Sequence, residues 1–146
     1  MSRVRGSIDI ARTVEDVFEV VADPRNEVRY NPGMTESVKI TDGPIGVGTT
    51  FRSTVLIRGR PVEVRTECTG LDRPHRFATR NVMAGAVAEG EVRCGPIPGG
   101  TSFSWEWQMS VSGPARIAGP LIALIGRHRE RRIWTGLKRM LEDGRP

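Results

Sequence analysis

The stretch TSFSWEWQMSVS, residues 101–112, alternates between apolar and polar side chains over most of its length. A repeat of two residues is typical of a β-strand with one buried and one exposed face. The stretch therefore predicts the longest strand of an antiparallel sheet that packs one face on the core. The apolar positions are Phe103, Trp105, Trp107, Met109 and Val111.

After this strand the repeat changes, and residues 115–143 predict a long helix with a kink allowed at Gly119-Pro120. The last part of the helix carries an apolar stripe opposite its basic residues. A sheet with one apolar face must be covered, and this helix is the element left to cover it. The stripe consists of Ile133, Leu137, Met140 and Leu141.

Toward the N-terminus, further segments with a two-residue repeat are separated by turns rich in glycine and proline. Between the first and the second of them, Thr13 is a plausible N-cap of a helix that ends at Asp23-Pro24, and a second short helical piece covers 24–30. The predicted order is strand, two short helices, six strands and a long helix. The remaining predicted strands are 3–10, 37–41, 51–58, 62–68, 76–83 and 86–94.

Three segments resemble the START-like (SRPBCC) superfamily, which includes polyketide cyclases/dehydrases and lipid-transport proteins. They are IDIARTVEDVFEVVADPRNEVRYNPGM (8–34), DGPIGVGTTF (42–51) and LDRPHRFATR (71–80). The resemblance covers nearly the whole chain and implies a single domain, 1–146, with the α+β helix-grip fold. In that fold a curved seven-stranded antiparallel sheet wraps around the long C-terminal helix and leaves a cavity between them.

The superfamily contains carriers, receptors and enzymes, so the fold leaves the function open. We expect a binding or carrier protein for a small hydrophobic molecule, such as a lipid, an isoprenoid or a polycyclic aromatic. One alternative is a polyketide-type cyclase or dehydratase, and another is an interaction module that uses the basic C-terminal helix. The residues expected to line the ligand are Tyr30, Met34, Phe51, Val55, Val64, Asn81, Trp105, Trp107, Met109, Gly126 and Glu130.

Glu130 interrupts the apolar stripe, because the inner helix face extends back through Glu130, Gly126 and Ile122. A buried carboxylate must be paired or neutralised. Arg80 is a candidate partner, although either Arg80 or Asn81 could face inward. The competing interpretation is a rim residue that pairs with a neighbouring arginine.

Two other groups of candidates also have two interpretations. Trp105 and Trp107 either pack in the core or stack on a ligand, and Tyr30 either orients a polar ligand group or has no role. If the protein is an enzyme, the acid–base candidates are Glu130, Tyr30 and Arg80.

The net charge of +5 is concentrated in RHRERRIWTGLKR, residues 127–139, since the rest of the chain is balanced. This segment is either a solvated helix face or a contact for an anionic membrane surface. No nucleic-acid motif accompanies it, so we do not expect nucleic acid as a partner. The membrane contact would use Arg127, Arg131, Arg132, Lys138 and Arg139.

Other chemistry has little support in the sequence. Cys68 and Cys94 are expected to be reduced core residues, and His75 and His128 are isolated, so no metal or cofactor is expected. No run of about 18 apolar residues and no signal peptide is visible, which favours a cytoplasmic protein.

Overall fold

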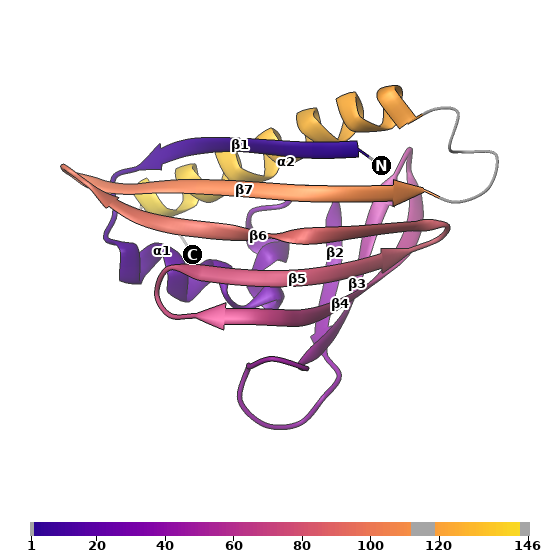
Figure 1. The fold of residues 1–146 in the computed structure, drawn as a ribbon, viewed down its shortest axis with the longest axis horizontal. Helices are drawn as coiled ribbons and strands as arrows, with labels where there is room; N and C mark the ends of the chain where they lie inside the picture. The colour runs from indigo at the N-terminus through magenta and orange to yellow at the C-terminus, as the bar shows by residue number, and fades with distance from the viewer. Residues whose placement is uncertain (1, 112–118, 144–146) are drawn as a thin grey trace.

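The computed structural model describes residues 2–111 and 119–143, with side chains for 2–111 and 126–143. It contains one antiparallel sheet with the strand order β1-β7-β6-β5-β4-β3-β2 (Figure 1). The strands are β1 (Ser2–Ile10), β2 (Met34–Lys39), β3 (Thr50–Ile57), β4 (Arg60–Asp72), β5 (Arg76–Met83), β6 (Ala86–Ile97) and β7 (Gly100–Val111). The predicted seven-stranded helix-grip architecture is confirmed.

Helix α1 (Val14–Val21) follows β1 and begins where the sequence predicts. The Thr13 side chain accepts a hydrogen bond from the backbone N–H of Asp16 at 3.2 Å, which caps the helix. A 3-10 helix, η1 (Pro24–Arg29), comes next, and Asp23 caps it through the backbone N–H of Arg25 at 3.0 Å. The long helix α2 spans Gly119–Glu142. The start predicted for it, at residues 115–118, lies outside the described residues.

The second strand is displaced from its predicted range. Residues 37–41 were expected, but β2 begins at Met34 and ends at Lys39. A register shift between Met34 and Glu36 against β3 interrupts the alternation of side chains at the start of the strand. Such a bulge hides the two-residue repeat, which explains the displaced prediction.

The sheet has an inner face toward the helices and an outer face. Figure 1 shows α1 and α2 together behind the sheet. The cross-strand register places Asn81 opposite Thr66 and Ala88 on the inner face, while Arg80 lies opposite Glu67 and Glu89 on the outer face. The structure therefore decides the orientation of the strand 76–83 that the sequence left open.

The two ends of the inner face differ in how completely they are filled. Near α1, buried apolar residues from β1, β4–β7 and the last part of α2 form the main core cluster, which includes Phe103, Trp105 and Trp134. Toward the β3–β4 and β5–β6 hairpins, inner-face side chains are only partly buried. These are Ile57, Val62, Met83, Ala88 and Met109.

No helix among the described residues is both long enough and apolar enough to cross a membrane.

Candidate functional site

Successive turns of α2 lie over alternate residues of β7. A Cβ on Gly126 would lie 3.4 Å from the Met109 Sδ, and two turns later the Trp134 ring is 4.9 Å from Phe103 and 6.1 Å from Trp105. Four helical residues advance about 6 Å and two strand residues about 7 Å, so the two spacings match closely. Glu130 falls between these contacts, beside Trp107.

Glu130 lies between the filled and the partly open ends of the inner face. Burial raises the pKa of its carboxyl group from 4.5 to about 7, and the nearby Glu27 carboxylate adds to the increase. The indole N–H groups of Trp107 and Trp134 and the Arg129 cation act in the opposite direction. Glu130 makes no ion pair within the described part of the chain. It is thus a buried acid whose main polar neighbours are indoles.

Glu27 brings a second carboxylate to this region from η1. Asn31 Nδ2 donates a 2.7 Å hydrogen bond to Glu27 Oε2, and Asn31 Oδ1 accepts one from the backbone N–H of Gly33 at 3.0 Å. Burial raises the pKa of Glu27, while the Asn31 bond and the Arg129 charge lower it. The Asn31 side chain therefore stabilises, by hydrogen bonds, both the position of the Glu27 carboxylate and the turn that leads into β2.

Tyr30 connects η1 with α2. Its ring centroid lies 5.9 Å from that of Trp134, and burial raises the pKa of its hydroxyl well above 10, with further contributions from Glu27 and Glu130. The phenol stays protonated at any physiological pH. It can therefore donate a hydrogen bond but cannot act as a base.

Buried polar atoms without a partner are rare in folded proteins and call for a physical reason. Three such atoms occur among the described residues: Trp107 Nε1, Trp134 Nε1 and Ser37 Oγ. The two indole N–H groups face the Glu130 carboxylate and lower its pKa by weak hydrogen bonding, although neither contact has the geometry of a full hydrogen bond. Two donors beside one acid could together bind one polar group.

The residues that the sequence selected on the sheet lie in different parts of the inner face. Asn81 Oδ1 accepts a 2.6 Å hydrogen bond from the Thr66 hydroxyl, and Asn81 Nδ2 donates one to Thr79 Oγ1 at 3.1 Å. Both polar atoms of the Asn81 side chain therefore already have partners within the protein. Trp105 lies in the main core cluster. Phe51, Val55 and Val64 are buried on the inner face outside that cluster, and Met34 pairs with Val55 at the sheet edge. The side chain of Ile122 lies outside the described residues.

The prediction that Arg80 could pair with Glu130 is wrong. Arg80 Nε donates a 3.0 Å hydrogen bond to Glu89 on the outer face of the sheet, with the backbone of β5 between it and α2. Arg80 consequently does not belong to the inner-face site. The alternative paired Glu130, as a rim residue, with a neighbouring arginine; Glu130 is half-buried, and no ion pair of its carboxyl group occurs among the described residues.

Sequence reasoning missed two residues of this site. Trp134 is one turn after Glu130 on the same helix face, and the 3.6-residue repeat could have identified it. Glu27 lies on a 3-10 helix of six residues, whose short length gives no repeat to interpret. Only the folded structure shows that Glu27 lies near Glu130.

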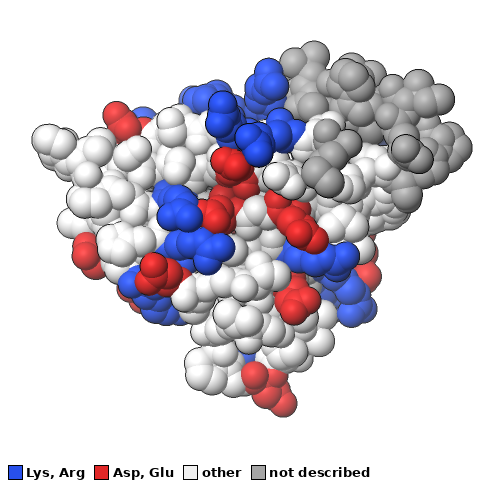
Figure 2. All heavy atoms as spheres, viewed as in Figure 1, with Lys and Arg blue, Asp and Glu red and all other residues white. Residues whose placement is uncertain are grey.

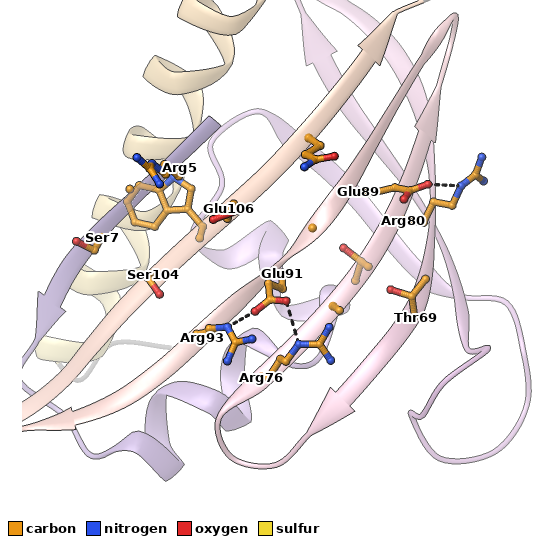
Figure 3. A pocket seen from close by; sticks show the side chains of 16 residues that line it. Arg5, Ser7, Thr69, Arg76, Arg80, Glu89, Glu91, Arg93, Ser104 and Glu106 are labelled. Carbon is orange, nitrogen blue, oxygen red and sulfur yellow. Dashed lines mark hydrogen bonds and ion pairs between the residues drawn. The ribbon is translucent and has the colours of Figure 1, made fainter. Parts of the chain in front are cut away.

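A broad hollow on the outer face has a different character (Figure 3). Glu91 pairs there with Arg76, at 2.9 Å, and with Arg93, and Glu89 pairs with Arg80. Figure 2 shows acidic and basic side chains interspersed over this side of the molecule. Because the charges already satisfy one another, the outer hollow does not resemble a ligand site.

Comparison with known proteins agrees with this architecture. A sequence model described as "Polyketide cyclase / dehydrase and lipid transport" matches residues 1–142. The chain belongs to this family. This member of the polyketide cyclase/dehydrase and lipid transport family is 33% identical, over 127 residues, to an uncharacterised protein of Mycobacterium tuberculosis, covering 78% of this chain and 69% of the relative.

Solved structures with the same fold are also known. A START superfamily protein from Mycobacterium smegmatis has a TM-score of 0.85 at 16% identity, covering 98% of this chain and 99% of that one. A protein from Rhodobacter sphaeroides has a TM-score of 0.75 at 18% identity, covering 96% of this chain and 92% of that one. At these identities the likeness establishes the fold alone.

Proposed function

We propose that the protein binds a small hydrophobic molecule with one polar group between the inner face of the sheet and α2. The observation that carries this proposal is the position of Glu130. Its carboxyl group lies beside two indole N–H groups that make only weak contacts with it and no full hydrogen bond, where the filled core meets the partly exposed apolar surface. The ligand class is a lipid, an isoprenoid or a polycyclic aromatic.

The apolar part of the ligand would cover the open end of the inner face. Val62, Met83, Ala88 and Met109 point inward yet remain partly exposed. Removing apolar surface from water contributes roughly 25 cal/mol per Å². A ligand chain or ring that covers these side chains would therefore stabilise the folded protein as it binds.

The polar part of the ligand would be held by the tryptophans and Glu130. A carbonyl or hydroxyl oxygen could accept hydrogen bonds from Trp107 Nε1 and Trp134 Nε1, both of which lack a partner. A ligand hydroxyl could also donate to Glu130. Each satisfied buried donor removes a cost of about 1–3 kcal/mol.

The test uses titration with N-phenyl-1-naphthylamine, a neutral apolar fluorescent probe with one N–H group. We expect saturable 1:1 binding, blocked when Ala88→Trp fills the open end of the inner face. Val82→Trp is the matched control, because Val82 lies on the outer face and is 38% exposed. Equal probe binding in both variants, with both folded, would place the ligand elsewhere. Native mass spectrometry of the protein from its own host would then identify the natural ligand.

A cyclase or dehydratase activity is the second candidate function, favoured by the pKa of about 7 at Glu130. A carboxyl group that titrates near neutral pH can both accept and donate a proton, as general acid–base catalysis requires. Glu130→Gln separates the two functions. The carrier predicts an unchanged ligand and no turnover in either protein, whereas the enzyme predicts that the variant keeps probe binding and loses turnover by about 100-fold or more.

A further inference from the structure

A second surface hollow lies along the flank of α2, in a groove of about 910 Å³ between that helix and residues 28–32. We call it the basic groove. No Asp or Glu is among the side chains that line it. Its cationic and imidazole side chains are Arg29, Arg127, His128, Arg131, Arg132 and Arg139.

The arginine side chains of the basic groove have no anionic partner among the described residues. Within the described residues, the side chains of Arg127, Arg132 and Arg139 make no ion pair or hydrogen bond, and that of Arg29 has only a 3.4 Å contact with Asn26 Oδ1. Arg131 stacks over the Trp105 ring at 5.4 Å, which leaves its charge unpaired. On the outer face, by contrast, the arginines of β5 and β6 pair with Glu89 and Glu91.

An uncompensated row of guanidinium groups is costly to assemble unless an anion binds there, because like charges repel. Arg127 and Arg139 lie twelve residues apart on α2, or about 18 Å along the helix axis. One small anion would reach only one or two of these groups. A surface that carries many phosphates could reach all of them, since guanidinium groups bind phosphate oxygens in pairs of hydrogen bonds.

One wall of the basic groove is apolar as well as exposed. Val28 is 38% exposed, and Pro32 lies beside it. Apolar side chains next to arginines suit the boundary between lipid headgroups and acyl chains. Nucleic acid fits less well, because no exposed Phe, Tyr or Trp side chain lines the groove for stacking on bases: Tyr30 is 6% exposed.

We propose that the basic groove docks the protein on the surface of an anionic phospholipid membrane, with its arginines on the headgroup phosphates. The proposal stands apart from the ligand site, since it does not require the interior ligand to be a lipid. Val28 and Pro32 would touch the acyl boundary. The interior ligand could be taken up or released while the protein is docked.

The experiment is vesicle co-sedimentation of the full chain with phosphatidylglycerol and phosphatidylcholine in a ratio of about 3:7. Each cation near an anionic membrane strengthens binding about fivefold, so Arg127→Glu/Arg132→Glu is expected to weaken it at least thirtyfold. The matched control, Arg5→Glu/Arg65→Glu, makes the same charge change on the outer face and should bind within about threefold of wild type. Binding should also fall steeply as sodium chloride approaches about 1 M.

Other results would overturn the proposal. These are equal binding to pure phosphatidylcholine vesicles, equal losses in the two double variants, and no vesicle binding by a protein that still binds glycerol phosphate in the groove. The last result would assign the groove to a free anion. Thermal unfolding of each variant verifies that it is folded, and Arg139→Gln provides a milder second variant with an expected loss of about fivefold. The naphthylamine titration is read separately, so failure of the ligand site and failure of membrane docking remain distinguishable.

Discussion

Gly136 packs its Cα against the carbonyl group of Tyr30, so closely that a Cβ at this position would come within 3.0 Å of the Tyr30 oxygen. This approach fixes α2 against the end of η1, and with it the distance between Tyr30 and Trp134. The clashing atoms belong to the backbone, which cannot move aside as a flexible side chain would. The contact therefore needs glycine.

Gly136→Ala is expected to lower the free energy of unfolding by about 1–3 kcal/mol, because overpacking outweighs the gain in helix propensity. Gly126→Ala is the matched control on the same helix. A Cβ there would lie 3.4 Å from Met109 Sδ and 3.5 Å from Val4 Cγ2, which flexible side chains can accommodate, so the control should be neutral or up to about 1 kcal/mol more stable. Urea denaturation measures both values, and similar results for the two variants would contradict the clash.

The pH dependence of stability should reveal the buried acid. The pKa of Glu130 is about 7 in the folded chain and returns to about 4.5 on unfolding. Between these values the folded state holds a proton that the unfolded state releases, so the free energy of unfolding falls as the pH rises to about 7 and then levels. From about pH 5.5 to pH 8, Glu130 accounts for a loss of about 2 kcal/mol.

Glu130→Gln should remove that contribution and flatten the stability profile. The increase in the pKa of Glu27, also caused by burial, acts in the same direction and would remain. Glu106→Gln, an exposed change on the outer face of β7, should keep the wild-type profile. A Glu130→Gln variant with the full wild-type slope would show that another group titrates.

Asn31 is expected to be important for stability even though it lies in a loop. Asn31→Ala leaves the buried Glu27 carboxylate and the Gly33 N–H without their partners, which should cost about 2–4 kcal/mol. Thr35→Ala is the control, since the Thr35 hydroxyl makes only an exposed 3.4 Å contact and should change stability by less than about 0.5 kcal/mol. Chemical denaturation compares them, and equal effects would argue against the Asn31 bridge.

The two thiols should be unreactive in the folded protein. Cys68 and Cys94 are free and buried, and burial raises the pKa of Cys94 to about 12 and that of Cys68 above its usual 9.0. Because the thiolate is the reactive form, a disulfide reagent at about pH 8 should label neither residue faster than the chain unfolds. Both should react at once in concentrated guanidinium chloride. Rapid labelling of the native protein would contradict the burial.

Strands with a regular repeat could be predicted from the sequence, and those with interruptions could not. The alternation of Phe103, Trp105, Trp107 and Met109 correctly placed the inner face of β7. β2 was displaced because its bulge interrupts the repeat.

The position of a site residue could be predicted from the sequence only where it depends on a single helix or strand. Helical spacing placed Glu130 on the inner side of α2, since its position depends only on the rotation of that helix. The residues around Glu130 depend on how η1, β7 and α2 pack against one another. The local sequence pattern therefore predicts neither that Glu27 lies near Glu130 nor that Arg80 lies on the opposite face of the sheet. The orientation of Asn81 required the pairing of β5 with β4 and β6.

The pairing of β1 with β7 has a consequence for how the chain is made. The two strands face each other residue by residue, from Ser2 opposite Met109 to Ile10 opposite Thr101, although about a hundred residues separate them in the chain. At roughly 5–20 residues per second, a ribosome needs on the order of 5–20 s to complete β7 after it has finished β1. The newborn β1 spends those seconds with Val4 and Ile8 uncovered. Protection of nascent β1 during those seconds, as well as the stability of the finished protein, would then affect the yield of folded molecules.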